Sequence, residues 1–264
     1  MTYYTVNPPA TLSKFVRYFW VLESESPSYI HRSMADACAE MIFHYSGQFK
    51  ELKNEGAEMS ARAAMQGPSN IVRRFEIQRT FGMFGVYLYP YSIPALFDIP
   101  AAEISNQIPD LLAMCGKEGE VLEERMMLAE TNAARIEIIV SFLEKRVRKA
   151  QLKQHPVFSA IADIIHSNGL ATIEKVADQY FISQRQFERK FKEYAGLTPK
   201  LFSRIVRFQA ACRLFGAQQR SLTGIGYECG YYDQSHFIHD FREFSGYHPK
   251  LYFSGHAEGT EWRV

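Results

Sequence analysis

The chain has 264 residues and a mass of 30.4 kDa, which suits one large domain or two of ordinary size. Hydrophobic residues make up 47% and charged residues 22%, which excludes a disordered, collagen-like or disulfide-stabilised chain. The formal net charge of +1 excludes a strong overall field that would attract nucleic acid or acidic membrane. The charge is unevenly distributed, however: the first 150 residues carry a net −2 and the remainder +3.

The cysteines and the N-terminus point to a cytoplasmic protein. No two cysteines have the C-x-x-C spacing of a zinc ribbon or redox pair, and none of the first residues forms a basic region followed by an apolar core. The longest uncharged stretch, residues 80–97, contains two glycines and two prolines, so strands and turns explain it better than a membrane helix. We expect reduced thiols and no membrane segment. The cysteines are Cys38, Cys115, Cys212 and Cys229.

Residues 1 to about 108 carry strand and turn signals. Segments 15–22, 41–45 and 81–91 are rich in aromatic and β-branched residues, and prolines separate them. This half has no Gly-rich phosphate loop, no G-x-S-x-G elbow and no H-E-x-x-H helix, so we predict no catalytic residue, no cofactor and no metal site. Its aromatic side chains suit either an ordinary core or an apolar pocket for a small-molecule effector. They are Tyr18, Phe19, Trp20, Phe43, Tyr45, Phe81, Phe84, Tyr87, Tyr89 and Tyr91.

Helical periodicity begins after Pro109. A Gly-Lys-Glu-Gly turn is expected at 116–119, and residues 131–149 are predicted to form a long amphipathic helix with a basic last turn. The apolar stripe of this helix can pack on its own domain or form a homodimer through residues 131–149, and both uses remain open. The stripe consists of Ile136, Ile139, Val140, Leu143 and Val147.

The C-terminal part repeats itself, which is the strongest signal in the chain. Six residues recur 50 positions later, and an upstream set recurs at an offset of 49. Two related helix-turn-helix units would give this pattern, with one residue added inside the second. The six pairs are Phe187/Phe237, Phe191/Phe241, Gly196/Gly246, Pro199/Pro249, Lys200/Lys250 and Leu201/Leu251.

Each unit predicts a capped helix with one buried face. In the first, Thr172 caps a short helix, Ser183 and Gln186 form a capping box, and Ile182 makes a hydrophobic staple with Phe187. In the second, Asp233 is the cap and Tyr232 is expected to staple onto Phe237. The faces opposite the phenylalanines carry Arg185, Arg189 and Lys192 in the first unit, and Ser235, His239 and Arg242 in the second.

A helix over residues 199–215 is predicted to join the units. At ~1.5 Å per residue it would span ~24 Å, a suitable spacer for two helices in successive major grooves of one duplex face.

The two repeated motifs resemble the AraC family of bacterial transcription regulators. The motifs are SQRQFERKF at 183–191 with GLTP at 196–199, and GYYDQSHFIHDF at 230–241 with GYHP at 246–249. The opening residues 8–20 and the CAEMIFH segment at 38–44 resemble a less characterised N-terminal domain found with such DNA-binding regions. The resemblance implies an α+β chain. A mixed β-rich and helical sensor or dimerisation domain (1–148) would be joined by a linker (149–155) to an all-α double helix-turn-helix domain (156–256), with a tail at 257–264.

The resemblance also implies sequence-specific binding of double-stranded promoter DNA, with RNA polymerase as a further partner. Carried onto this chain, it assigns base reading to Arg185, Glu188, Arg189, Gln234, Ser235 and His239. The candidates for phosphate contacts are Ser183, Gln186, Lys192, Lys200, Arg242 and Lys250.

Four alternatives compete with parts of this interpretation. The charged face of the first unit could be solvated, with Glu188 paired to Arg185 or Lys192. The N-terminal domain could be a protein-interaction module, or a thiol-based repair enzyme that uses Cys38 or Cys115. His236 and His239 are spaced like metal ligands, but the sequence shows no matching carboxylate or thiol cluster.

Overall fold

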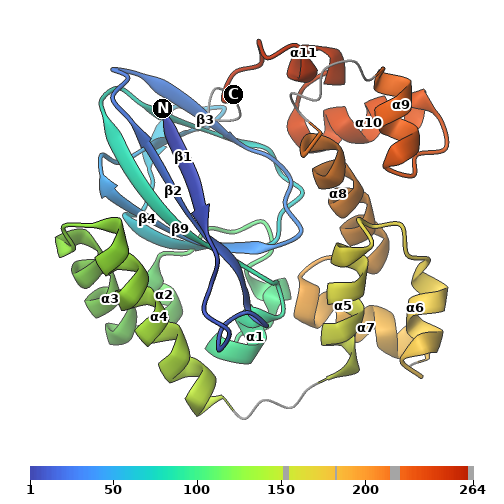
Figure 1. Ribbon diagram of the computed structural model, residues 1–264, viewed down its shortest axis with the longest axis horizontal. Helices are drawn as coiled ribbons and strands as arrows, with labels where there is room; N and C mark the ends of the chain where they lie inside the picture. The colour runs from blue at the N-terminus through green and yellow to red at the C-terminus, as the bar shows by residue number, and fades with distance from the viewer. Residues whose placement is uncertain (151–154, 182, 215–220, 261–264) are drawn as a thin grey trace.

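A computed structural model describes residues 1–150, 155–181, 183–214 and 221–260 of the chain. Nine strands lie within the first 88 residues, and the described residues beyond them form helices and connecting loops (Figure 1). This confirms the predicted α+β class, with a β-rich N-terminal part followed by a helical C-terminal part. Each helix in the described ranges is too short or too polar to cross a lipid bilayer.

Two antiparallel sheets make up the β-rich part. The larger has the strand order β1-β2-β9-β4-β7, and the smaller has the order β3-β8-β5-β6. All eight residues of β9 are buried. This strand lies between β2 and β4 within the larger sheet, so neither of its edges is exposed. The larger sheet comprises β1 (Thr2–Val6), β2 (Val16–Ser24), β9 (Phe81–Leu88), β4 (Ala39–Ser46) and β7 (Ala63–Gln66). The smaller comprises β3 (Tyr29–Ser33), β8 (Arg73–Ile77), β5 (Lys50–Leu52) and β6 (Ala57–Met59).

The third predicted strand, over 81–91, is too long. β9 ends at Leu88, and helix α1 (Ser92–Phe97) follows directly. Pro90 cannot donate to a strand ladder, whereas Pro94 falls within the first turn of α1, where no intrahelical donor is required. A short 3₁₀ helix, η1 (Ala101–Glu103), then leads toward the helical segment.

Three helices, α2 (Leu111–Cys115), α3 (Lys117–Leu128) and α4 (Asn132–Lys149), complete the N-terminal part. Only Gly116 of the expected four-residue turn lies between helices, because Lys117 already begins α3. The prediction for α4 is confirmed: Thr131 caps it by accepting a hydrogen bond from the Ala134 amide (3.1 Å). Ile139 and Leu143 are buried within their own domain, so this part of the stripe is intramolecular core. The expected linker falls largely on residues 151–154, outside the described residues.

The C-terminal helices form two similar units joined by α8 (Pro199–Cys212) (Figure 1). Buried phenylalanines from α8 enter both cores: Phe202 meets Phe191 (ring centroids 5.2 Å apart), and Phe208 meets Phe241 (5.2 Å). The joining helix is therefore shorter than predicted, but it packs into both units. The remaining helices are α5 (Pro156–His166), α6 (Ile173–Gln179), α7 (Gln184–Ala195), α9 (Leu222–Glu228), α10 (Gln234–Ser245) and α11 (Pro249–Phe253).

One of the three predicted helix caps forms its side-chain hydrogen bond, and two do not. Asp233 caps α10 through a hydrogen bond from the His236 amide (2.7 Å), as expected. Thr172 and Ser183 stand at the predicted cap positions without a side-chain cap bond; the Ser183 hydroxyl instead contacts the Gln186 side chain (3.3 Å). The staple through Tyr232 is wrong, because this ring is 87% exposed. Its neighbour Tyr231 packs on Phe237 instead, with ring centroids 5.2 Å apart. The staple through Ile182 lies outside the described residues.

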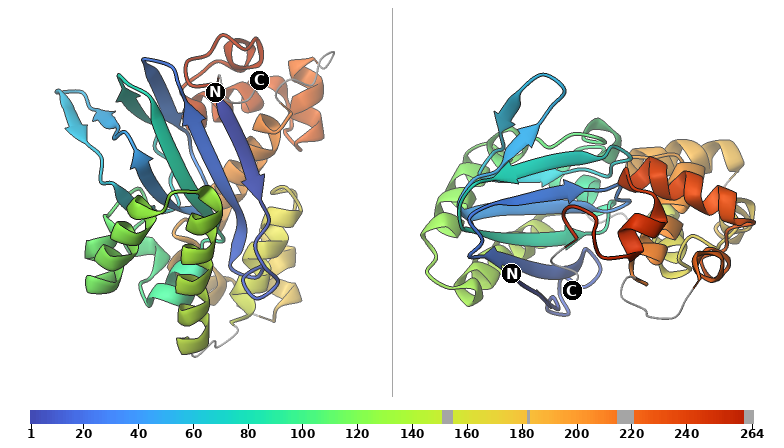
Figure 2. Two further views of the ribbon diagram at one scale, coloured as in Figure 1. Left: turned by 60° about the vertical axis from the view of Figure 1, so that its left-hand side comes forward. Right: turned by 90° about the horizontal axis from the view of Figure 1, so that it is seen from above.

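The N-terminal and C-terminal parts touch at several places, as the two views of Figure 2 also show. The Ser105 hydroxyl donates to the Gly196 carbonyl (2.7 Å) at the end of α7. The Ala35 amide donates to the Phe244 carbonyl of α10 (2.8 Å). After α11, Glu258 accepts two hydrogen bonds from the Arg74 guanidinium of β8 (both 2.8 Å). The expected tail thus starts with residues that hold the C-terminal end against the smaller sheet.

Candidate functional site

The first predicted recognition helix, α7, presents its charged face to solvent. Arg185, Glu188 and Arg189 are all exposed, whereas Phe187 and Phe191 are buried on the opposite side. Glu188 accepts a hydrogen bond from the Gln184 side chain (3.3 Å). Among the described residues, neither Arg185 nor Lys192 forms an ion pair with it. The ion-paired alternative for this face therefore has no support, and the two arginines have no ionic partner within the described chain.

The second predicted recognition helix, α10, is far less cationic. Gln234, Ser235 and His239 are exposed, and α10 lies at the other end of α8 from α7 (Figure 1). The structure thus separates the six predicted base-reading residues into two groups of three, one on each repeated unit. Their role in reading bases stays a prediction.

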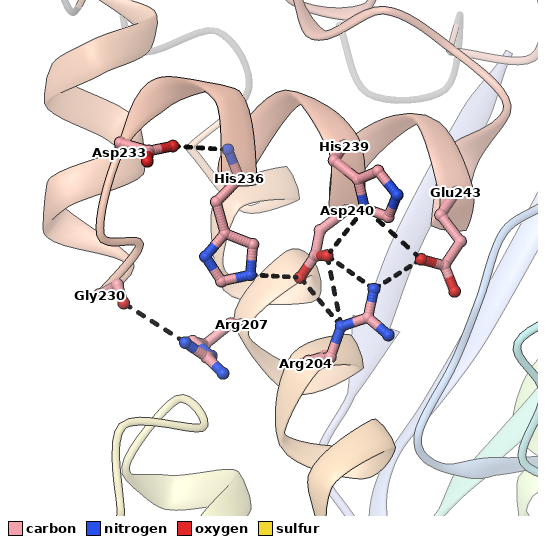
Figure 3. Close-up of polar contacts among 8 residues, drawn as sticks. All are labelled: Arg204, Arg207, Gly230, Asp233, His236, His239, Asp240 and Glu243. Atoms are coloured by element: carbon pink, nitrogen blue, oxygen red, sulfur yellow. Dashed lines mark hydrogen bonds and ion pairs between the residues drawn. The ribbon is translucent and has the colours of Figure 1, made fainter.

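A polar cluster fixes α10 on α8 (Figure 3). The Arg204 guanidinium of α8 lies 2.7 Å from Asp240 Oδ1 and 2.5 Å from Glu243 Oε2. Asp240 is almost wholly buried, so this ion pair is shielded from water on one side. His239 Nδ1 lies 3.6 Å from Asp240 and 3.8 Å from Glu243. The cluster therefore holds α10 on α8, and His239 lies at its exposed edge.

The same cluster corrects the sequence reading of a metal site. Two carboxylates do accompany His239, and ligand atoms of His239, Asp240 and Glu243 lie within 4.8 Å of one another. Both carboxylates are engaged by Arg204, however, which already supplies the positive charge that a metal ion would bring. We therefore interpret His239, Asp240 and Glu243 as part of an ion-pair cluster with Arg204 that has a structural role.

The predicted phosphate contacts surround the two recognition helices. Ser183, Gln186 and Lys192 are exposed on or beside α7, and Arg242 is exposed on α10. Lys200 and Lys250 are exposed at corresponding positions, each directly after the proline that begins α8 or α11. This repeated placement suits contacts to DNA phosphates, which would set the position of the protein along the duplex.

The second candidate site is a cavity of about 900 Å³ between the two sheets and α8. Alternate residues of β2, β4 and β9 line it, while the intervening Phe19, Phe43 and Phe84 are buried in the core. Phe208, Gln209 and Cys212 of α8 form part of its wall. The cavity lies within the volume range of small-molecule sites. Of the aromatic residues named from sequence, Tyr18, Trp20 and Tyr87 line it.

Two carboxyl groups in this cavity were missed in the sequence. Burial raises the pKa of Glu40 to about 8, and the neighbouring Asp36 adds to the effect. Burial also raises the pKa of Asp36, against the hydrogen bonds that it accepts from the Cys38 amide and the Tyr87 hydroxyl (both 2.7 Å). A single acidic residue inside the apolar segment Ala39–Phe43 was the signal that could have revealed Glu40.

The structure gives no support for a reactive thiol in the N-terminal part. Cys38 is buried beside the Arg17 guanidinium (3.5 Å), and burial raises the pKa of its thiol to about 11. Burial also raises the pKa of Cys115. A nucleophilic cysteine needs the opposite shift, toward the thiolate at neutral pH.

Two different family models match the N-terminal and C-terminal parts of the chain. Residues 176–255 match a family model described as a helix-turn-helix domain, and residues 4–110 match a domain of unknown function, DUF6597. The transcriptional activator RhaS of Escherichia coli is 35% identical over 77 residues, which are 29% of this chain and 28% of RhaS. The chain therefore aligns with little more than a quarter of these curated relatives.

Solved structures share the overall fold at low sequence identity. ToxT from Vibrio cholerae aligns with a TM-score of 0.51 and 13% identity, covering 96% of this chain and 98% of ToxT. ToxT bound to (E)-4-(8-methylnaphthalen-1-yl)but-3-enoic acid aligns with a TM-score of 0.50 and 11% identity, covering 97% of this chain and all of the other. The β-rich domain followed by paired helix-turn-helix units is thus an arrangement already observed in an experimental structure.

Proposed function

The C-terminal part of this chain is an AraC-type double helix-turn-helix domain, and from this premise we propose that the whole protein is a sequence-specific transcription regulator of promoter DNA. The observation that supports the proposal is the repeated unit: the exposed polar faces of α7 and α10 lie at opposite ends of α8. Arg185, Glu188 and Arg189 would read bases in one major groove, and Gln234, Ser235 and His239 in the next. No catalytic step is needed for this role.

The N-terminal domain would modulate DNA binding. Its cavity has α8 as one wall, so a small molecule bound there would contact the helix that joins both reading units. The ToxT structure with a bound organic acid supports a small-molecule effector in this fold. A ligand shifts DNA affinity only by the difference in its affinity for the two states of the protein. Dimerisation through 131–149 and contact with RNA polymerase are further parts of this proposal, for a protein acting in the cytoplasm.

Selection of bound sequences from a random DNA library, at a stated salt concentration, tests the proposed function. We expect an enriched motif with two parts spaced by about one helical turn. Recovery of unenriched DNA would contradict sequence-specific reading.

Replacement of one base-reading arginine then tests the assignment. Arg189→Ala should weaken binding to the selected site by about 1–3 kcal/mol and relax the preference at one base position, because a bidentate contact to guanine is lost. Lys190→Ala is the matched control: it removes one charge from the same helix, but its ammonium is bound to Glu193 (2.9 Å). Equal losses on selected and random DNA would show that Arg189 contacts only the backbone.

A further inference from the structure

The cavity of the N-terminal domain contains a carboxyl group whose charge nothing in the described chain balances. Every Lys and Arg in the cavity wall already contacts a protein acceptor: Arg17 with Cys38, Arg32 with Glu258, Lys53 with Glu58, Arg73 with Glu51, and Arg213 with Asn168. The other carboxylates of the wall are also engaged. Glu51 and Glu58 are paired with these cations, Asp36 accepts from the Cys38 amide and the Tyr87 hydroxyl, and Asp110 caps α2. Glu40 forms no ion pair with any described residue.

The strand register places Glu40 in an aromatic corner. Tyr18 of β2, Tyr87 of β9 and Glu40 of β4 lie in one row across three neighbouring strands. The Tyr18 and Tyr87 rings stack with centroids 4.8 Å apart. In the adjacent row, the Trp20 indole crosses Gly85, where a Cβ would lie 2.0 Å from the ring. The missing side chain of Gly85 is what lets the indole reach across β9 toward β4.

The indole of Trp20 is neutral and cannot balance the charge of this carboxyl. Its N–H lies close enough to lower the pKa of Glu40, against the larger effect of burial, but its geometry falls short of a regular hydrogen bond. The buried Nδ1 atom of His44, four residues after Glu40 on the same face of β4, also has no partner among the described residues. Burial lowers the pKa of His44 to about 4, so this ring is neutral at pH 7 and cannot balance the carboxylate.

We propose that the cavity binds an organic cation, a protonated amine or a quaternary ammonium with an apolar or aromatic body, whose charge pairs with Glu40 and packs against Trp20 and Tyr18. A cation at this position gains a cation–π interaction with the aromatic face and a charge-assisted hydrogen bond or ion pair with the desolvated carboxylate. At this position the protein supplies the carboxylate and the rings, whereas Arg17 in the same wall contacts the Cys38 thiol and the Tyr87 ring instead. This assignment deepens the proposed function, since it rests on the cavity being the effector site.

A hydrogen-bonded chain connects this position to α8. The Tyr87 hydroxyl donates to Asp36 (2.7 Å) and accepts from the Gln209 side chain of α8 (3.1 Å). Asp36 in turn interacts electrostatically with Glu40. A cation that stabilises the ionised form of Glu40 therefore changes the electrostatic environment of Asp36. Asp36 is linked through Tyr87 to Gln209 of α8, the helix shared by both proposed DNA-reading units. The ligand is thereby placed to change the arrangement that the reading units adopt.

Calorimetry with charge-matched probes tests the ligand class. Phenethylamine, 2-phenylethanol and phenylacetate share one aromatic body and differ in charge, and choline supplies a cation without a ring. We expect the full chain to bind phenethylamine or choline at least about tenfold more tightly than the neutral and anionic probes. Glu40→Gln should abolish this preference. Glu58→Gln, which removes a paired carboxylate from the cavity rim, should retain it.

A second readout is the proton balance of binding. The titratable groups around Glu40 are Tyr3, Tyr18, His31, Asp36, His44 and Tyr87, with Arg17 as the nearby permanent cation. Because burial raises the pKa values of both Glu40 and Asp36, choline binding at pH 7 should release close to one proton from this pair. Binding enthalpies in two buffers of different ionisation enthalpy measure the release, which Glu40→Gln should eliminate.

Three results would overturn the proposal: equal or tighter binding of phenylacetate, an unchanged cation preference in Glu40→Gln, or no cation binding below about 1 mM. These measurements use the protein without DNA. If the cation does not bind but the DNA selection yields an enriched motif, only the proposed ligand class is contradicted. If the selection yields no motif, the proposed function is contradicted. Circular dichroism of Glu40→Gln checks that the variant is folded.

Discussion

At the scale of single residues, the functional groups differ in how visible they are in the sequence. Arg185 and Arg189 were identified because a helical period of 3.6 assigns each residue to a face without knowledge of the rest of the fold. Glu40 was missed, since its meaning depends on which residues the neighbouring strands place beside it. β9, its partner strand, is buried along its whole length and shows no polar and apolar alternation. Without that alternation, the sequence does not say which side chains face a cavity.

Glu40 gives a prediction about stability and pH. Its pKa is raised in the folded protein, so the folded state holds a proton that the unfolded state releases above about pH 4.3. The contribution of Glu40 to stability should therefore fall as pH rises from about 5 to 8. Glu40→Gln lacks this penalty, and we expect it to be more stable than the native chain at pH 8 by about 1 kcal/mol or more.

Urea unfolding of both proteins at pH 5 and pH 8 measures this difference. The advantage of the variant should be larger at pH 8. An advantage that is the same at both pH values, or larger at pH 5, would show that Glu40 is not held protonated by its surroundings.

At the scale of elements, the repeat predicted the helical half well, because each unit is specified by local caps and a buried phenylalanine pair. The errors lie where tertiary packing overrides the local motif. Tyr232 stands at the staple position, yet the buried ring is Tyr231. The hydroxyl of Ser183 contacts a side chain rather than the helix N-terminus. Six of the nine strands, β1, β3, β5, β6, β7 and β8, escaped prediction. Each is at most five residues long, too short to show a clear strand pattern in the sequence.

The contact of α8 with α10 gives a second prediction. Arg204→Met should destabilise the C-terminal part by about 3 kcal/mol, because it leaves the buried Asp240 carboxylate without its strongest partner. Lys117→Met, which breaks an exposed pair with Glu120, should cost less than about 1 kcal/mol.

Chemical denaturation of the two variants provides the comparison, and Arg204→Met/Asp240→Leu refines it. The double variant should recover much of the lost stability, because no buried charge remains unpaired. If Arg204→Met cost no more than Lys117→Met, the cluster in Figure 3 would not hold α10 in place.

At the scale of the whole molecule, the arrangement of the two parts followed from no sequence signal. Some of their contacts use backbone atoms, such as the Gly196 carbonyl and the Ala35 amide, which are present in every residue type. Others pair side chains far apart in the sequence, such as Arg74 with Glu258. Gly196 is informative only in the structure. It ends α7 with a φ of +78°, and a Cβ there would lie 2.4 Å from Ser105 Oγ and 3.1 Å from the Ala101 carbonyl.

Gly196→Ala therefore probes the contact between the parts. Gly255→Ala is the control, since Gly255 has a φ of +77° and open space around its Cβ position. Both variants carry backbone strain of about 1 kcal/mol, but only Gly196→Ala should also loosen the N-terminal part from α7, for a total of about 2 kcal/mol. Hydrogen exchange at η1 should rise in Gly196→Ala alone. Equal exchange in the two variants would mean that this contact contributes nothing to docking.

The joining helix has a consequence for the promoter itself. α8 is a single rod of ~21 Å whose ends are locked into two cores by Phe202 and Phe208. Inserting one base pair between the two halves of the DNA site rotates one half by about 34° and moves it about 3.4 Å. Because α8 is one continuous helix, the two units cannot shift relative to each other to follow this change. Spacing mutations should therefore abolish recognition even where every contacted base is kept. Under the proposed function, the relative phase of the two half-sites along the DNA would be set by the length of one protein helix.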